Sequence, residues 1–248
     1  MVFSTTATET LAGLEIAKDD LASYDLETGT ASLFFSGDLF LSNENIDAAH
    51  ILEDGRIILS TAGAASLGGL TFGDGDLVEY DPGTGTASLF FSEGSFSGNE
   101  DIDAVHVLAN GKILLSTAGS ATLGGLSFQD GDIVEYDPDS QTATLFLSES
   151  VFSNNEDIDA IHLLSDGRLL LSTANAASLG ELTFRDGDVV EYDALLGTAT
   201  LVFSEDLFTS GAQISALSAL PAPEPGTLIL LAGGGVSVLI RYRRRAAG

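Results

Sequence analysis

Cysteine and tryptophan are absent from this sequence, and basic residues are few. Without cysteine the protein has no thiol nucleophile, no cysteine-ligated zinc and no disulfide. Without tryptophan, and with only 5 tyrosines, it has few of the rings that form sugar-binding platforms, which weakens carbohydrate binding relative to cation binding or plain scaffolding. Because 9 Lys and Arg stand against 37 Asp and Glu, a formal net charge of −28, we exclude nucleic acid as a partner and expect cations as the natural small ligands.

An internal repeat of 56 residues organises most of the chain. Residues 101–156 and 157–212 align with residues 45–100 without insertion or deletion. The three histidines of the chain occupy one repeat position: His50, His106 and His162. Residues 1–44 form a partial first copy that begins partway through the unit, and residues 214–220 match the strand that this copy lacks.

Each repeat predicts four short antiparallel strands. In the copy at 101–156 these are expected at Ile102–Leu108, Lys112–Thr117, Asp132–Tyr136 and Thr142–Ser148. Asn110-Gly111 joins the first two as a tight hairpin turn, because this pair tolerates the positive φ angles of a type I′ turn. The segment between the second and third strands is expected to be a loop of small residues.

Four antiparallel strands at a fixed period are typical of a β-propeller blade. We predict an all-β fold, a propeller-like ring of about four 56-residue blades over residues 1–220, followed by a short apolar helix in a tail at 221–248. Pairing of Val2–Thr5 with Ile214–Leu220 closes the ring and removes open sheet edges. An open β-solenoid made of parallel coils is the alternative.

Familiar catalytic motifs are missing from the sequence. It contains no GxSxG, HExxH or P-loop pattern, and its carboxylates recur so regularly that none stands apart as a tuned acid or base. We therefore expect a protein that is not an enzyme. A carbohydrate-active propeller enzyme is the alternative, because glycoside hydrolysis needs only two carboxylates, and it requires a carboxylate pair that is not repeated.

The tail combines a short motif, an apolar run and a basic end. The motif is Pro223-Glu224-Pro225, the apolar run is Leu228–Ile240, and the arginines that follow are Arg241, Arg243, Arg244 and Arg245. The apolar stretch is shorter than the ~20 residues of a stable membrane span, which favours transient insertion over an ordinary C-terminal anchor. Arginines after the run stay cytoplasmic by the positive-inside bias, so the acidic body lies outside.

These three parts, in this order, resemble the PEP-CTERM sorting signal of biofilm-forming Gram-negative bacteria. The resemblance implies recognition by an exosortase, a membrane-embedded cysteine enzyme that acts near the Pro-Glu-Pro. It also implies an exported protein that is transiently anchored by its tail and then released or transferred to the cell surface. The repeated body resembles uncharacterised exported bacterial proteins. Since Met1–Asp20 lacks the basic and apolar regions of a signal peptide, we expect an in-frame signal upstream of Met1.

Acidic Asp-Gly-Asp segments recur before the third strand in three of the four copies. Clustered oxygen ligands on glycine-rich loops suit hard cations, so we predict Ca²⁺ there. The candidate ligands are Asp74, Asp76, Asp130, Asp132, Asp186 and Asp188. In the alternative interpretation these aspartates only accept hydrogen bonds from turn amides.

The first strand carries both Asp and His in three of the four copies. Alternation is expected to place the histidines and Asp47, Asp103 and Asp159 on opposite strand faces. A histidine ring near the axis would suit a transition metal, although the fourth copy has Ser218 and Ser215 at the two positions. Alternatively each His accepts from a backbone group between blades and each Asp caps a turn. The sequence as a whole predicts an exported binding or structural module of an exopolysaccharide-rich envelope, with exopolysaccharide or divalent cations as further partners.

Overall fold

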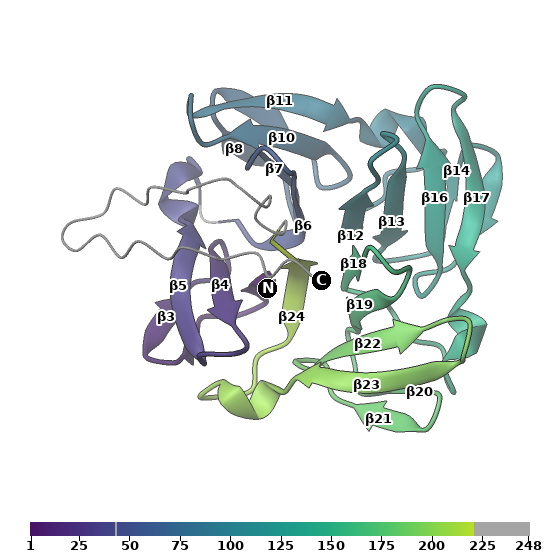
Figure 1. Cartoon of the computed structure of the whole chain (residues 1–248). Coiled ribbons are helices and arrows are strands. Elements are labelled where there is room, and N and C mark those ends of the chain that lie inside the picture. Colours follow the sequence, from purple (N-terminus) through teal and green to yellow (C-terminus); the bar gives the residue numbers. More distant parts are fainter. Residues whose placement is uncertain (43, 221–248) are drawn as a thin grey trace, which may run out of the picture.

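The computed structural model describes residues 1–42 and 44–220, and in them four four-stranded antiparallel sheets surround a central axis (Figure 1). In one blade the sheet order from outside to inside is β11, β10, β7, β6. These strands are β6 (Ile46–Ile51), β7 (Ile57–Thr61), β10 (Leu77–Asp81) and β11 (Thr86–Phe91). The predicted all-β propeller is confirmed.

The next two blades repeat this arrangement. One contains β12 (Ile102–Val107), β13 (Ile113–Thr117), β16 (Ile133–Asp137) and β17 (Thr142–Leu147). The other contains β18 (Ala160–Leu163), β19 (Leu169–Ser172), β22 (Val189–Asp193) and β23 (Thr198–Phe203). The predicted strand bounds therefore differ from the observed ones by one residue at several ends.

The fourth blade joins the two ends of the repeat region. Its inner strand is β24 (Ile214–Ser218), and the strands outside it are β1 (Val2–Thr5), β4 (Leu21–Asp25) and β5 (Thr30–Phe35). Strands β1 and β24 are antiparallel, with Val2 opposite Ser218 and Phe3 opposite Leu217. The ring therefore closes as predicted, and the open-solenoid alternative is wrong.

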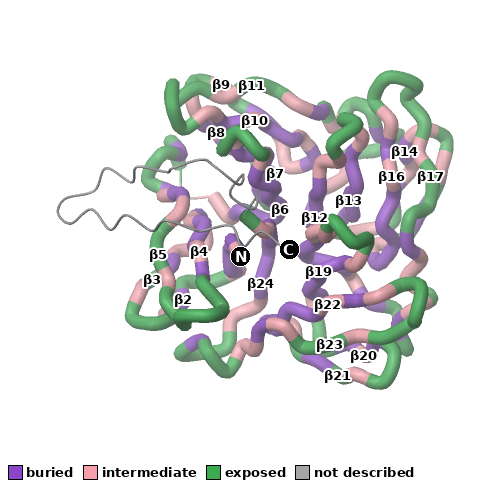
Figure 2. The backbone as a smooth tube through the Cα atoms, in the orientation of Figure 1, coloured by how far each residue is buried: buried purple, intermediate pink, exposed green. Residues whose placement is uncertain are grey.

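The hydrophobic core lies between neighbouring blades. One cluster joins Ile58 and Leu77 of one blade to Ile113, Leu115 and Val134 of the next. Because each inner sheet face packs on another blade, strands such as β7 are buried along their whole length, as Figure 2 shows for the strands around the axis. This explains why β7 and β13 are nearly continuous apolar runs without alternation.

A second small hairpin occupies the segment that was expected to be a loop. In one blade it comprises β8 (Ala65–Leu67) and β9 (Leu70–Phe72). The equivalent pairs are β2 (Glu9–Leu11) with β3 (Leu14–Ile16), β14 (Ala121–Leu123) with β15 (Leu126–Phe128), and β20 (Ala177–Leu179) with β21 (Leu182–Phe184). Gly68 turns this hairpin at φ +58°, and a Cβ there would lie 2.4 Å from the backbone nitrogen of Ala87, so the turn packs directly on β11.

Short 3₁₀ turns follow the outer strand of each blade and lead to the next one. They are η1 (Gly37–Leu39), η2 (Glu93–Ser95), η3 (Glu149–Val151) and η4 (Glu205–Leu207). The buried phenylalanine after each turn forms a β-bridge to the small hairpin of the following blade, as Phe96 does with Leu123. Within residues 1–42 and 44–220, no helix has the length and apolar character to cross a membrane. The predicted apolar helix of the tail lies outside the described residues.

Candidate functional site on the propeller axis

A bulge at the start of the inner strands decides which side chains reach the axis. The pairing of β6 with β7 skips Asp47 between Ile46 and Ala48, and the pairing of β12 with β13 skips Asp103 in the same way. The extra residue breaks the alternation of faces. The expectation that His and Asp lie on opposite faces, with each Asp capping a turn, is therefore wrong: both sets meet their counterparts from other blades.

The aspartates form a buried cluster near the start of the inner strands. Carboxylate oxygens of Asp103, Asp157 and Asp159 lie within 4.8 Å of one another. Asp47 lies in the neighbouring blade, and its negative charge raises the pKa of Asp103. Asp47 and Asp103 are each only 7% exposed, and neither oxygen of either side chain has a hydrogen-bond donor among the described residues.

Burial and mutual repulsion disfavour ionisation of these carboxyls. Desolvation is the main cause, and it raises the pKa of Asp101 and of Asp157 to about 6 and that of Asp159 to about 7. The pKa values of Asp47 and Asp103 rise well above their usual range for the same reason, with Asp101 and Asp157 as the nearest like charges.

Asp101 and Asp157 belong to this cluster although the sequence interpretation did not select them. Each lies two residues before an axial aspartate, in the pattern Asp-Ile-Asp. Asp101 stands just before the bulge, where the alternation of faces does not hold, so this spacing alone could not place the pair at the axis. The fourth copy differs: Gln213 donates its amide N–H to Asp159, and Ser215 donates its hydroxyl to the carbonyl oxygen of Ile46.

The second aspartate of each Asp-Gly-Asp segment uses both of its oxygens on backbone amides. Asp132 accepts from the N–H of Gln129 and from that of Glu149, both at 2.9 Å. Asp76 and Asp188 make the equivalent bonds in their blades. These carboxylates therefore fasten the loop to the following 3₁₀ turn, which is the structural role considered as the alternative to calcium binding.

The first aspartates of these segments lie beside the axial cluster. Asp74 raises the pKa of Asp101, Asp130 raises that of Asp157, and Asp186 raises that of Asp159 through their negative charges. The structure therefore separates the six predicted calcium ligands into two groups. Asp74, Asp130 and Asp186 add negative potential to the axis, whereas Asp76, Asp132 and Asp188 hold the loops.

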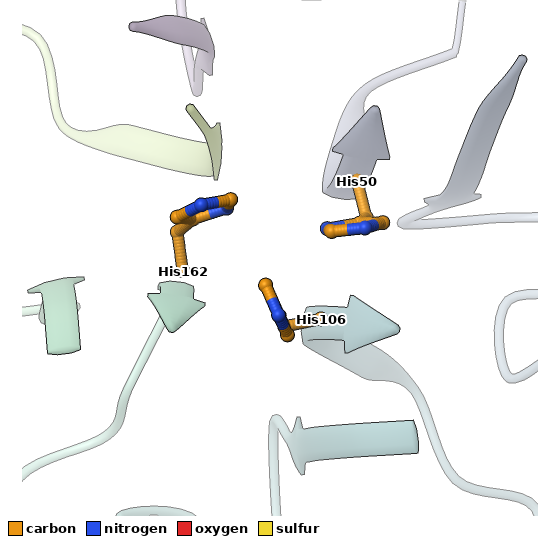
Figure 3. A group of neighbouring side chains, drawn as sticks. All are labelled: His50, His106 and His162. Carbon is orange, nitrogen blue, oxygen red and sulfur yellow. The ribbon is translucent and has the colours of Figure 1, made fainter. Parts of the chain in front are cut away.

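The three histidines gather near the other end of the inner strands, as Figure 3 shows. The ring centroids of His50 and His106 are 4.4 Å apart, and those of His106 and His162 are 4.6 Å apart. Burial lowers their pKa values to about 3 for His50, about 2 for His106 and about 4 for His162, so all three are neutral at pH 7. They line a cavity of about 860 Å³ together with residues of the tight hairpin turns, including Arg56 and Leu108.

Two of the histidines accept hydrogen bonds across blade boundaries. Nδ1 of His106 accepts from the N–H of Leu163, and Nδ1 of His162 accepts from that of Ala219, each at 3.2 Å. In the fourth blade Ser218 Oγ takes this role, accepting from the N–H of Ile51 at 3.0 Å. The predicted backbone role is thus confirmed for His106 and His162.

This bonding pattern argues against a transition metal on the histidines. A neutral imidazole that accepts at Nδ1 carries its proton on Nε2, so neither nitrogen of His106 or His162 offers a free lone pair. His50 differs, because its buried Nδ1 has no partner among the described residues. One free nitrogen does not make a metal site.

The tail was compared with models of known protein families. Residues 221–245 match the PEP-CTERM protein-sorting motif, a span that includes Pro223, Glu224, Pro225 and the arginines predicted from sequence. The chain carries a PEP-CTERM sorting signal. This C-terminal signal indicates an exported protein that is anchored transiently and then processed, and it implies processing by an exosortase. The motif residues themselves lie outside the described part of the structure.

The chain is also similar to several solved structures. No curated protein matches it. An auxiliary nutrient binding protein from Bacteroides thetaiotaomicron matches over 80% of this chain and 41% of its own, with 10% identity and a TM-score of 0.38. Virginiamycin B lyase from Staphylococcus aureus matches over 81% and 54%, with 12% identity and a TM-score of 0.35.

An extracellular domain from B. thetaiotaomicron matches over 78% of this chain and 21% of its own, with 16% identity and a TM-score of 0.33. The chain thus spans between about a fifth and about half of the length of these solved structures.

Proposed function

We propose that this protein is a non-enzymatic binding or structural module of an exopolysaccharide-rich cell envelope, delivered there by an exosortase. The observation that carries the proposal is the combination of a PEP-CTERM sorting motif with a closed ring of four similar blades. A closed ring with its core between blades leaves only short, protected sheet edges, which suits a component that must persist outside the cell.

The arrangement of the carboxylates supports a binding role over catalysis. A glycosidase needs two carboxyl groups in different environments, one held as an acid and one ionised. Here the neighbouring carboxyls Asp47 and Asp101 recur one blade further on as Asp103 and Asp157. A pair that recurs between successive blades lacks the unique position that a single active site requires.

The charge of the protein bears on its partner. A chain with a formal net charge of −28 repels an anionic polysaccharide unless cations lie between the two. Divalent cations bridge such surfaces because one ion can contact carboxylates on both sides. We therefore include divalent cations as the second partner of the proposed module.

The test follows an epitope-tagged full chain in a host that has its own exosortase. In the wild-type host the protein is expected at the cell surface and in the sedimented exopolysaccharide, and in an exosortase deletion it is expected in the membrane fraction. In the host that keeps its exosortase, a Glu224→Ala variant of the protein is expected to remain in the membrane fraction, as the unchanged protein does in the deletion strain.

The matrix role is tested separately by sedimenting purified protein with the exopolysaccharide of that host. Binding is expected with millimolar CaCl₂ and is expected to fall sharply with NaCl of matched ionic strength. The protein could be exported normally and yet stay in the supernatant with both salts. That result would leave the sorting function standing and would rule out the matrix role.

A further inference from the structure

We propose that the axial aspartates form a site for one calcium ion, held by Asp103, Asp157 and Asp159. Oxygens of these three carboxylates converge within 4.8 Å. Two oxygens bound to the same Ca²⁺ at about 2.3–2.6 Å from the ion can be separated by up to roughly twice that distance, so this convergence fits a shared ion. The site is independent of the sorting tail and of the proposed matrix role.

Unsatisfied oxygens are the second observation that points to a ligand. Both oxygens of Asp103 and Oδ1 of Asp157 are buried and accept no hydrogen bond within the described ranges. None of the ion pairs formed among residues 1–42 and 44–220 includes Asp103, Asp157 or Asp159. Buried carboxylates without donors or counter-charges are unfavourable, and a bound cation removes this cost.

The donor set selects the class of ion. All three side chains offer hard carboxylate oxygens, which favour Ca²⁺, Mg²⁺ or Mn²⁺ over metals that prefer nitrogen or sulfur. Calcium takes six to eight oxygens in flexible geometry, whereas Mg²⁺ demands a near-ideal octahedron. Asp47 is a further negative charge near the cluster, and water molecules can supply the remaining oxygens of an irregular calcium shell.

The differences between the copies place the site on one side of the axis. Gln213 stands where the other copies have Asn or Asp, and Ser215 stands where they have Asp. Gln213 donates its amide N–H to Asp159, and Ser215 donates its hydroxyl to the carbonyl oxygen of Ile46, so the fourth copy adds no carboxylate to the cluster. The negative charge is therefore concentrated on the side of Asp103, Asp157 and Asp159. The charges of Asp130 and Asp186, which act on Asp157 and Asp159, strengthen the field that attracts a cation.

The test is calorimetric titration of the full chain, freed of metal with EDTA and kept in mild detergent, with CaCl₂ at constant ionic strength. Wild type is expected to show one saturable site. The double variant Asp103→Asn/Asp159→Asn is expected to lose at least about tenfold in affinity. It is expected to remain folded without calcium, because the substitutions remove buried like charges, and circular dichroism checks this.

Asp132→Asn is the matched control, since this aspartate lies in the same blade but bonds only to backbone amides in the structure. Its calcium affinity is expected to equal that of wild type. If Asp132→Asn loses the site while the double variant keeps it, the ion binds the Asp-Gly-Asp loop and the axial assignment is wrong. If wild type shows no saturable binding, or all three proteins bind alike, the axial carboxyls are neutralised by shared protons and the proposal fails.

Discussion

Single histidine side chains fasten one inner strand of the propeller to the next. His106 and His162 each accept a backbone N–H from the following blade, and Ser218 accepts one from Ile51 at the closure of the ring. The inner strands belong to different sheets, so these side chains supply hydrogen bonds that no β-ladder provides there. His50 has no such partner, which makes it an internal reference for the other two.

Replacing His106 with Leu is expected to destabilise the fold more than the same change at His50. Both substitutions remove a buried imidazole, but only the first leaves the N–H of Leu163 without an acceptor. The difference in the free energy of unfolding is expected to be about 1–3 kcal/mol. Urea unfolding followed by circular dichroism measures it, and equal losses in His106→Leu and His50→Leu would show that the hydrogen bond contributes nothing.

The buried imidazoles also predict how acid affects stability. Desolvation lowers the pKa of His50 from its ordinary 6.5 to about 3. A group whose pKa is lowered by folding binds protons more tightly in the unfolded chain than in the folded one. The contribution of His50 to the free energy of unfolding is therefore complete above about pH 6.5 and is lost as the pH falls towards about 3.

The comparison that isolates this effect is wild type against His50→Leu. The excess stability of wild type over the variant is expected to fall by about 1 kcal/mol per pH unit between about pH 6 and about pH 4. Taking the difference cancels the carboxyl groups that the two proteins share. An excess that stays constant over this range would mean that His50 protonates as readily in the folded protein as in the unfolded one.

At the scale of the elements, closure of the ring depends on the short strand β1. Phe3 on this strand is fully buried, and its ring centroid lies 5.6 Å from that of Phe203 and 5.8 Å from that of Phe208. These two phenylalanines are about two hundred residues away in the sequence, so the contact joins both ends of the ring. Its loss opens a cavity at the closure itself.

Phe3→Ala is expected to lower the free energy of unfolding by about 3–5 kcal/mol. Phe146→Ala on the outer strand β17 is the control, because that side chain is 40% exposed and its removal is expected to cost about 1 kcal/mol or less. Urea midpoints of the two variants give the comparison. A loss at Phe3 as small as that at Phe146 would mean that the fold does not depend on packing at the closure.

The elements also show how far the sequence could predict the structure. The fixed period, together with an N-terminus that begins within the repeat, was enough to predict the blades and the pairing of β1 with β24. The hairpin of β14 and β15 was missed although its Leu-Gly-Gly-Leu turn is a hairpin signal, because its strands are only three residues long.

The axial site was harder to predict, because it depends on a bulge that leaves no mark on the local sequence. Asp103 and His106 are separated by an odd number of positions, which in a regular strand means opposite faces. The skipped residue at Asp103 changes this relation, and its position is set by how β12 pairs with β13 in the folded blade. The sequence singled out Asp103 and Asp159, but it did not show that their side chains would converge with Asp157 on the axis.

At the scale of the whole molecule, acidic charge acts in two distinct ways. A formal net charge of −28 spreads repulsion over the whole surface, and any salt screens this part. The buried axial carboxylates are sheltered from the diffuse ion atmosphere. Their mutual repulsion is therefore relieved only by bound protons or by a bound ion. The two contributions can therefore be separated by choosing which salt is added.

The full chain, first stripped of metal, is expected to gain stability as NaCl rises from about 0.01 M to about 0.15 M, since the screening length falls from about 30 Å to about 8 Å. CaCl₂ at matched ionic strength is expected to add about 2.7 kcal/mol when its concentration is about a hundredfold above the dissociation constant. For a domain of this size that gain raises Tm by several degrees.

The Asp103→Asn/Asp159→Asn variant separates the specific ion from the ionic atmosphere. It is expected to keep the whole response to NaCl, because the surface charge is almost unchanged, and to lose the additional response to calcium. Thermal melts of wild type and of the double variant, each in NaCl and in CaCl₂ of matched ionic strength, give the four Tm values for this comparison. A variant that still gains several degrees from calcium beyond matched NaCl would place the stabilising ion away from the axis, on the outer carboxylates of the blades.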